Sequence, residues 1–432
     1  MKKLLIIFGF TIILQTNCFA VTLSEALLEA YTNNAELNAE RENISVSKEN
    51  LNISRSEFLP SVTFEGSKSS EDTSKLTNQD GSNATITNIS PETRSVKIEQ
   101  KIFQGFGGIA DYKKSQIGLV LADAKLLQVE QKTLLKTVEA FSGLIFANEK
   151  FSINERNVNL SERQVETDRI RLDRGQVSVA DLAQSESSLA EAQAKFIQAK
   201  NDVITAKLNY KNVIGPIQES FYLNKDINLN IKIPLTLENA IQLSKINNPD
   251  LIIAKLEYEQ SERDVQIAQS DLAPSATLSF ESKKTDDLSS TYDQQDKETV
   301  EATIKWPLFS GGKNYAGLSK SKNLRNRKKL LLDNAFKVND TNVASAWSNM
   351  KSTASMLESV KLQVKAAEIA NEGITAEYES GKGRSTLDVI QSNSILLNSQ
   401  VSLANSERNY LLSQFKLLES VGLLTTKHLQ IN

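Results

Sequence analysis

Cysteine and histidine are almost absent from this chain, which has one of each in 432 residues, Cys18 and His428. The sequence therefore offers no disulfide framework and no Cys/His set for a metal ion, and it has little to build thiol or imidazole catalysis on. A glycine-rich loop that could cradle a phosphate is also missing. Carboxylate pairs occur on helical faces, where solvated surface is the simpler interpretation. We therefore expect no enzyme, no cofactor and no metal site.

Long apolar runs are missing after the first twenty residues, so the sequence predicts no later transmembrane helix. A strong excess of positive charge is missing as well. The chain has 50 lysines and arginines against 53 aspartates and glutamates, a formal net charge of −3. Nucleic-acid binding requires a basic surface, so we expect no nucleic-acid partner.

The N-terminus is typical of a secretory signal peptide, predicted over residues 1–20. Two lysines precede the apolar stretch Leu4–Leu14, and a small-x-small cleavage site ends at Ala20. Cleavage there would remove Cys18. Lipid attachment at Cys18 is the second interpretation, ranked lower because the three polar residues before it do not resemble a lipobox.

The rest of the sequence consists of two similar repeats. Residues 22–63 recur 214 positions later as 236–277, and the correspondence continues at offsets of 206 and then 207. A duplicated unit near 200 residues is far longer than a solenoid repeat. The predicted organisation is a first structural repeat over 21–215, a linker over 216–235, a second repeat over 236–423 and a C-terminal tail over 424–432.

Each repeat contains two segments in which apolar and polar residues alternate. In the first segments Val62 and Phe64 alternate with Thr63 and Glu65. A period of two predicts strands with one apolar and one polar face. The predicted strands lie at about 61–67, 94–103, 275–282 and 299–308, and the polar stretches between them, 68–93 and 283–297, are predicted loops.

Long helices are predicted after each pair of strands. The stretches from Gly105 to about Leu172 and from Gly311 to about Glu379 contain no proline and little glycine. A helix of that length extends over ~100 Å, which exceeds an ordinary globular core. Such helices persist only beside similar partners, so we expect coiled-coil packing.

Four amphipathic strands are too few to seal themselves against lipid. In hydrocarbon every unpaired backbone group costs several kcal/mol, so only closed barrels span a bilayer, and the smallest have about eight strands. If these strands lie in a membrane, several chains must share one barrel. A soluble sheet with one face on a core is the alternative, and it leaves the long helices without a globular partner.

Several motifs together resemble the TolC family of outer-membrane efflux and type I secretion ducts in Gram-negative bacteria. They are Leu-Pro-Ser-Val and Leu-Ala-Pro-Ser at strand entries, Ile-Phe-Gln-Gly and Leu-Phe-Ser-Gly-Gly at strand exits, and Tyr-Glu-Ser-Gly followed by Leu-Asp-Val-Ile. The resemblance covers essentially the whole chain after the signal peptide.

The resemblance implies a mainly α protein with a small β part. Three copies would form one 12-stranded β-barrel in outer-membrane lipid, continued into the periplasm by a coiled-coil α-helical barrel. Such a homotrimer passively conducts drugs or secreted proteins that it receives from a periplasmic adaptor protein and an inner-membrane transporter.

The turns between the long helices carry helix-end signals. Gly175 and Gly381 suit the left-handed conformation that ends a helix. Ser178 and Ser385 each begin a Ser-x-x-Asp capping box, which starts the next helix.

The resemblance adds a gate at these turns to their helix-capping role. It implies that Tyr378, Arg384 and Asp388 hold a closed constriction, with Asp181 as the acidic partner on the first hairpin. Gln391 stands where the family often has a second ring of aspartates. The second turn is also one residue longer than the first.

A different class of function stays open at this point, a secreted coiled-coil structural or adhesive protein without transport activity. Detergent-requiring trimers with single-channel currents would favour the duct, and a water-soluble monomer would favour this alternative.

Overall fold

The computed structural model describes residues 20–83, 88–216, 222–225, 232–289, 292–381 and 383–431. Residues 1–19 of the predicted signal peptide and most of the predicted linker 216–235 lie outside the described residues. Within the described ranges, no helix carries an apolar stretch long enough to cross a membrane.

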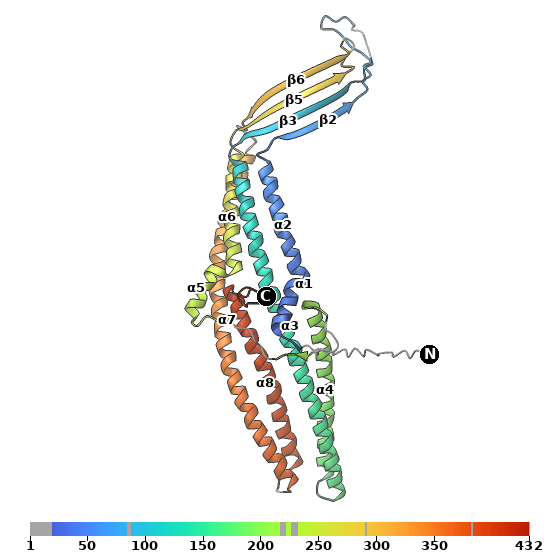
Figure 1. Ribbon diagram of the computed structural model, residues 1–432, viewed down its shortest axis with the longest axis vertical. Coiled ribbons are helices and arrows are strands. Elements are labelled where there is room, and N and C mark those ends of the chain that lie inside the picture. Colours follow the sequence, from blue (N-terminus) through green and yellow to red (C-terminus); the bar gives the residue numbers. More distant parts are fainter. Residues whose placement is uncertain are drawn as a thin grey trace, which may run out of the picture. The chain divides into compact units, whose positions relative to one another are not determined.

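The two halves of the sequence build matching elements (Figure 1). Each begins with a short helix of 11 residues and a helix of 22 residues, followed by two strands, a helix of 67 residues and a helix of 35 or 36 residues. In the first half these are α1 (Leu23–Asn33), α2 (Ala35–Ser56), β2 (Ser61–Lys68), β3 (Glu92–Gln104), α3 (Gly107–Asp173) and α4 (Val179–Val213). In the second half they are α5 (Leu237–Asn247), α6 (Pro249–Ser270), β5 (Ser275–Asp286), β6 (Gln294–Lys305), α7 (Lys313–Glu379) and α8 (Thr386–Val421).

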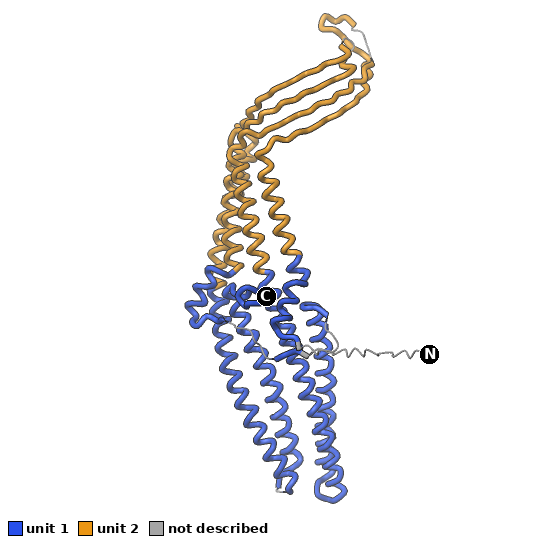
Figure 2. Tube along the Cα trace, in the orientation of Figure 1, with its two compact units in different colours: residues 1–38, 129–248, 340–432 blue, residues 39–128, 249–339 orange. Residues whose placement is uncertain are grey.

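The compact units do not follow the halves of the sequence, because each unit takes residues from both (Figure 2). Unit 1 comprises residues 1–38, 129–248 and 340–432, and unit 2 comprises 39–128 and 249–339. A two-residue parallel pair, β1 (Ala20–Val21) with β4 (Tyr222–Leu223), belongs to unit 1.

Unit 2 contains an antiparallel sheet in the order β2-β3-β5-β6 (Figure 1). The register places Val62, Ile98, Phe280 and Val300 in one row across all four strands. The neighbouring row is polar and consists of Ser61, Glu99, Ser279 and Glu301. Because side chains alternate between faces, the sheet has the apolar face and the polar face that the alternation predicts.

The strand bounds need a correction in the second half. The predicted fourth strand, about 299–308, is observed over 294–305, and β5 continues to Asp286. Polar cross-strand pairs such as Lys284 with Asp296 sustain the ladder where the apolar alternation has stopped. At the other end Pro307 has no amide to donate, so β6 stops before Trp306.

The helices of unit 2 follow the same lateral order as its strands. Polar contacts link α2 to α3, α3 to α6, and α6 to α7. They are Ser54 Oγ to Asp111 Oδ2 at 2.7 Å, Lys114 Nζ to Asp264 Oδ1 at 2.7 Å, and Lys328 Nζ to Glu257 Oε2 at 2.6 Å.

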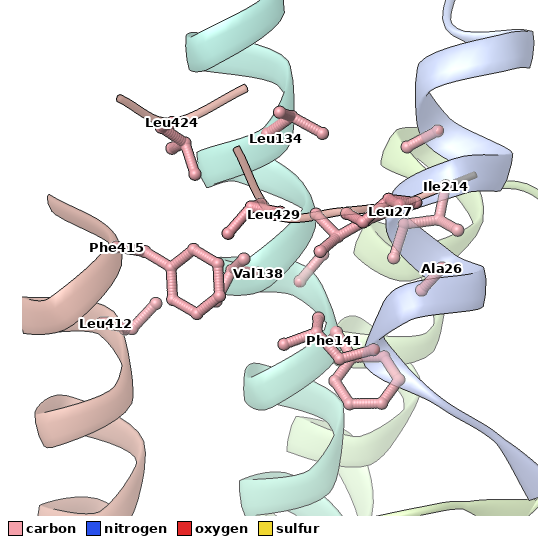
Figure 3. Close-up of a cluster of buried hydrophobic side chains, with 14 of the residues drawn as sticks. Ala26, Leu27, Leu134, Val138, Phe141, Ile214, Leu412, Phe415, Leu424 and Leu429 are labelled. Atoms are coloured by element: carbon pink, nitrogen blue, oxygen red, sulfur yellow. The ribbon is translucent and has the colours of Figure 1, made fainter. Parts of the chain in front are cut away.

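Unit 1 has the larger apolar core, built from α1, α3, α4, α8 and the C-terminal segment (Figure 3). Leu27 and Phe141 are fully buried in it, as are Phe415 and Leu424. The residues predicted as a C-terminal tail are therefore packed into this core, with Leu429 only 3% exposed. A second cluster joins α5, α7 and α8.

Candidate functional site at the hairpin turns

The first turn joins α3 to α4 and lies in unit 1. Gly175 has φ +69°, the left-handed conformation that ends a helix. Asp181 closes the capping box, because its Oδ2 accepts from the Ser178 amide at 2.8 Å while its own amide donates to Ser178 Oγ at 3.2 Å. The bonds from the Ser178 hydroxyl and amide lower the pKa of Asp181.

The second turn repeats this construction between α7 and α8. Gly381 has φ +71°, and the Ser385 amide donates to Asp388 Oδ2 at 2.9 Å. The bonds from the Ser385 amide and hydroxyl lower the pKa of Asp388, and the charge of Arg384 adds to the effect. Both aspartates are therefore ionised at neutral pH.

Arg384 pairs with the last turn of α7, within its own hairpin. Its Nε donates to Glu377 Oε2 at 2.6 Å. The described part of the chain contains no ion pair between Arg384 and Asp181. A link between those two residues stays a prediction.

Tyr378 is the most buried of the gate candidates. It is 5% exposed, and its hydroxyl donates to Asp168 Oδ1 at 2.5 Å. The same hydroxyl lies 3.0 Å from Thr386 Oγ1 at the start of α8. Burial raises the pKa of Tyr378, and the bond to Asp168 raises it further, so the phenol stays protonated.

Asp168 is the residue that sequence reasoning missed. It is fully buried, and its Oδ2 accepts from Ser185 Oγ on α4 and from Gln164 Nε2 on α3. At the offset of 206 that relates α3 to α7, its counterpart is Ile374. The difference between the repeats, aspartate in the first and isoleucine in the second, is the sequence signal that could have identified Asp168.

Arg171 adds a second connection between the hairpins. Its guanidinium lies 4.1 Å from the centre of the Tyr378 ring, and one of its amino groups donates to the Tyr378 carbonyl at 3.3 Å. An arginine over a tyrosine face is attractive through the ring quadrupole. Hydrogen bonds and this contact thus tie the end of α7 to α3.

Gln391 lies on the wall of a cavity of about 300 Å³ that residues of α3, α4 and α8 line. Gln164 and Ser185 line the same cavity. The described residues contain no group of three or more His, Cys, Asp or Glu side chains that could hold a metal ion. The residues named above hold helix ends against one another. Their side chains do not form a catalytic arrangement such as a nucleophile beside a general base.

Comparison with known proteins identifies the class of protein to which this chain belongs. The family model described as "Outer membrane efflux protein" matches residues 26–215 and 240–423. The chain is 24% identical over 421 residues to outer membrane efflux protein BepC of Brucella suis biovar 1, covering 97% of this chain and 89% of BepC. It is 19% identical over 433 residues to the alkaline protease secretion protein AprF of Pseudomonas aeruginosa, covering 98% and 89%. The Campylobacter jejuni CmeC outer membrane channel has the same fold, with a TM-score of 0.82 at 15% identity over 93% of this chain and 85% of that one.

Two long helical hairpins with a small amphipathic sheet therefore define an outer-membrane channel protein, and the resemblance to the TolC family is confirmed. The chain belongs to the outer membrane efflux protein family. Its location is the outer membrane of a Gram-negative cell, with extension into the periplasm. The family consists of channel proteins and not of enzymes.

Proposed function

We propose that three copies of this chain form a passive duct through the outer membrane and across the periplasm. An inner-membrane transporter and a periplasmic adaptor protein would load it and supply the energy. The two sequence repeats, 21–215 and 236–423, would each contribute one helical hairpin and two strands per copy.

The apolar row of the sheet is the observation that carries this proposal. Val62 and Val300, at the two ends of that row, are 67% and 73% exposed. Both lie on strands that pair on one side only within the chain, because β2 and β6 are the edges of the sheet. Lipid would cover the apolar face, and pairing between β6 of one copy and β2 of the next would satisfy the edges.

We infer three copies from the number of strands that each chain supplies and from the resemblance to the TolC family. One chain supplies four strands to this sheet, fewer than the ~8 of the smallest closed barrel. Three chains supply twelve. The polar row of Ser61, Glu99, Ser279 and Glu301 would then face a water-filled lumen.

The gate would lie at the hairpin turns. Asp388 and Asp181 stay ionised because their capping bonds lower their pKa values. Three copies of Asp388 around a narrow opening would favour cations. Tyr378 and Arg384 would hold the closed form, with Gln391 as a neutral position deeper in the hairpins.

The cargo class is drugs or secreted proteins. One relative carries efflux in its name and another carries protease secretion. Both kinds of cargo use the same passive path, so the duct itself does not need to distinguish them by chemistry.

The proposal is tested with two substitutions on adjacent residues of β6. Val300→Lys places a charge on the apolar face, which costs about 2–4 kcal/mol at the membrane midplane. Thr299→Lys places the same charge on the polar face and is the matched control. We expect the wild-type chain and Thr299→Lys to form heat-modifiable trimers on SDS gels and to conduct in planar bilayers, and Val300→Lys to do neither.

Two results would contradict the proposal. One is a wild-type chain that is stable, single and non-conducting in buffer without detergent. The other is equal behaviour of the two lysine variants, since the faces of the sheet would then not differ in environment.

A further inference from the structure

Residues of α3, α7 and α8 in unit 1 line a second cavity, of about 280 Å³. Its wall is mainly apolar and includes Phe141, Ile145 and Phe146 from α3, Leu357 from α7, and Ala404 and Leu411 from α8. The side chains of Phe141, Leu357 and Ala404 are buried. Sites for small molecules have volumes of about 300–1,000 Å³, so this cavity suits a small ligand with an apolar body.

Arg408 of α8 adds a positive charge to this apolar wall. Its Nε is buried and has no hydrogen-bond partner among the described residues. The guanidinium extends toward α3, because a Cβ placed on Gly143 would be 3.9 Å from an Arg408 amino group. A buried donor without a partner is costly. The wall therefore presents a charged donor that an acceptor on a ligand would satisfy.

The two carboxylates on the same wall are already engaged. Lys225 Nζ lies 2.7 Å from Glu149 Oε1 and 2.6 Å from Glu407 Oε2. Burial lowers the pKa of Lys225, but the bonds to the two carboxylates outweigh burial and raise that pKa above its ordinary value. The ammonium group is therefore charged at neutral pH. A cationic ligand would have to displace Lys225 from the carboxylates, whereas an anionic ligand would displace no protein group from Arg408.

We propose that this cavity binds a small amphipathic anion, namely a carboxylate with an apolar body, such as a medium-chain fatty acid. The Nε of Arg408 and the neighbouring amino group form a fork that matches the two oxygens of a carboxylate. The apolar body lies against Phe141, Phe146 and Leu411. The site goes beyond the proposed duct and does not depend on it, because the wall belongs to unit 1 of one chain.

Both parts of such a ligand contribute to its affinity. A hydrogen bond between charged groups is about twice as strong as one between neutral groups, so a carboxylate is preferred to an alcohol of the same length. Each methylene that enters the apolar space raises the affinity about fourfold. Octanoate should therefore bind more tightly than hexanoate, and acetate should bind very weakly.

The repeats differ at the residues that form this site. At the offset of 207 that relates α4 to α8, the counterpart of Arg408 is Asn201. At the offset of 206 that relates α3 to α7, the counterpart of Phe146 is Ser352. The duplicated position has neither the cation nor this apolar contact, so we expect one site per chain.

The test uses the full chain in lipid nanodiscs, with empty nanodiscs as the blank. Trifluorooctanoate is the probe, and fluorine NMR distinguishes probe bound to protein from probe in lipid and in water. Competition with octanoate, octylamine and octanol then compares an anionic, a cationic and a neutral head on the same apolar body.

Three variants and one control accompany the wild type. Arg408→Gln removes the cation from the cavity wall. Ala404→Leu adds apolar volume to the wall and leaves every charge in place. Lys225→Gln frees Glu149 and Glu407. Lys416→Gln is the matched control, because it removes a positive charge from the same helix at a residue that does not line the cavity and pairs only loosely with Glu139, at 3.6 Å.

We expect one saturable site per chain in the wild type and in Lys416→Gln, with octanoate the best competitor. Arg408→Gln should weaken probe binding about 10- to 100-fold, the range for a lost bond between charged groups. Ala404→Leu should weaken it at least tenfold, because the added side chain fills the space of the apolar body, and it decides the matter if Arg408→Gln does not fold. Lys225→Gln should reverse the preference, so that octylamine competes better than octanoate.

Several outcomes would overturn the proposal. One is probe binding that empty nanodiscs reproduce. Another is octylamine or octanol that competes as well as octanoate with the wild type, because the site would then not select an anion. Wild-type affinity in Arg408→Gln or in Ala404→Leu would place the bound probe elsewhere, and an unchanged preference in Lys225→Gln would remove the reason for choosing an anion. None of these measurements uses conductance, so failure of the proposed duct would leave them unaffected.

Discussion

Gly422 lies directly against the backbone of Asn247, so closely that a Cβ on Gly422 would be 2.3 Å from the Asn247 carbonyl carbon. Gly422 caps α8 with φ +82°. Only glycine adopts this conformation without strain, and here the space is closed as well. The close approach of the end of α8 to the end of α5 at this point therefore requires glycine at position 422.

Gly422→Ala should destabilise unit 1 by about 2–4 kcal/mol, since left-handed strain of about 1–3 kcal/mol adds to a clash with backbone that cannot rotate away. Thermal unfolding followed by circular dichroism measures the effect. Gly373→Ala is the control, because that glycine is helical with open space where its Cβ would be. It should be neutral or stabilising by up to about 1 kcal/mol, and equal losses for the two variants would contradict the packing.

Ser178→Ala and Ser385→Ala should each weaken the first turn of the following helix by about 1 kcal/mol, because the capping acceptor is lost. Amide hydrogen exchange at Asp181 and Asp388 measures it, with an expected increase of about fivefold. Ser187→Ala, an exposed serine within α4, is the control and should leave exchange unchanged.

The caps also predict a pH dependence. The pKa values of Asp181 and Asp388 are lowered in the folded chain. Their contribution is therefore complete above the ordinary aspartate value of about 3.9 and is lost as pH falls through the lowered values. The protection factor at the two turns, which is the intrinsic exchange rate divided by the observed rate, should fall only in strong acid. A protection factor that falls near neutral pH would show that the caps are not the cause.

Leu424→Ala should cost about 2–5 kcal/mol, because the side chain is fully buried and its removal leaves a cavity. Leu235→Ala makes the same chemical change at a residue that is 88% exposed and should stay within about 0.5 kcal/mol. Thermal midpoints of the two purified variants decide between a packed C-terminal segment and a free one. Indistinguishable midpoints would favour the free tail.

Arg384→Ala or Asp181→Ala should raise the basal conductance in planar bilayers if these residues hold the proposed gate. Exposed ion pairs contribute only about 0–1 kcal/mol each, so an increase of a few fold is expected. Glu377→Gln separates two explanations, since it removes the partner that Arg384 has within the turn. An effect of Arg384→Ala that Glu377→Gln reproduces would assign the role to the local pair, and unchanged conductance in all three would remove Arg384 from the gate.

Local chemistry was predictable from the sequence. The alternation around Val62 and Val300 indicates the faces of the sheet, and Ser-x-x-Asp indicates both helix starts, because each pattern acts over a few residues. The end of β6 was less predictable. Trp306 continues the alternation, but Pro307 ends the ladder.

The network at Asp168 could not be read from local pattern, because its partner Tyr378 is 210 positions away in the sequence. The packing of long helices brings the two residues together, and the sequence shows only that an aspartate replaces an isoleucine between the halves. The pairing of Arg384 shows the same limit, since Glu377 at the end of α7 lies in the same hairpin and competes with any partner from another helix.

The unequal turns have a consequence for symmetry. The first turn reads Gly175 to Asp181, and the second has an additional residue and a second left-handed glycine, Gly383 at φ +83°. The proposed trimer would thus end in six tips of two alternating kinds, a threefold pattern that only approximates a sixfold one. Any ring of six identical proteins placed against these tips would have to use one surface in two different ways.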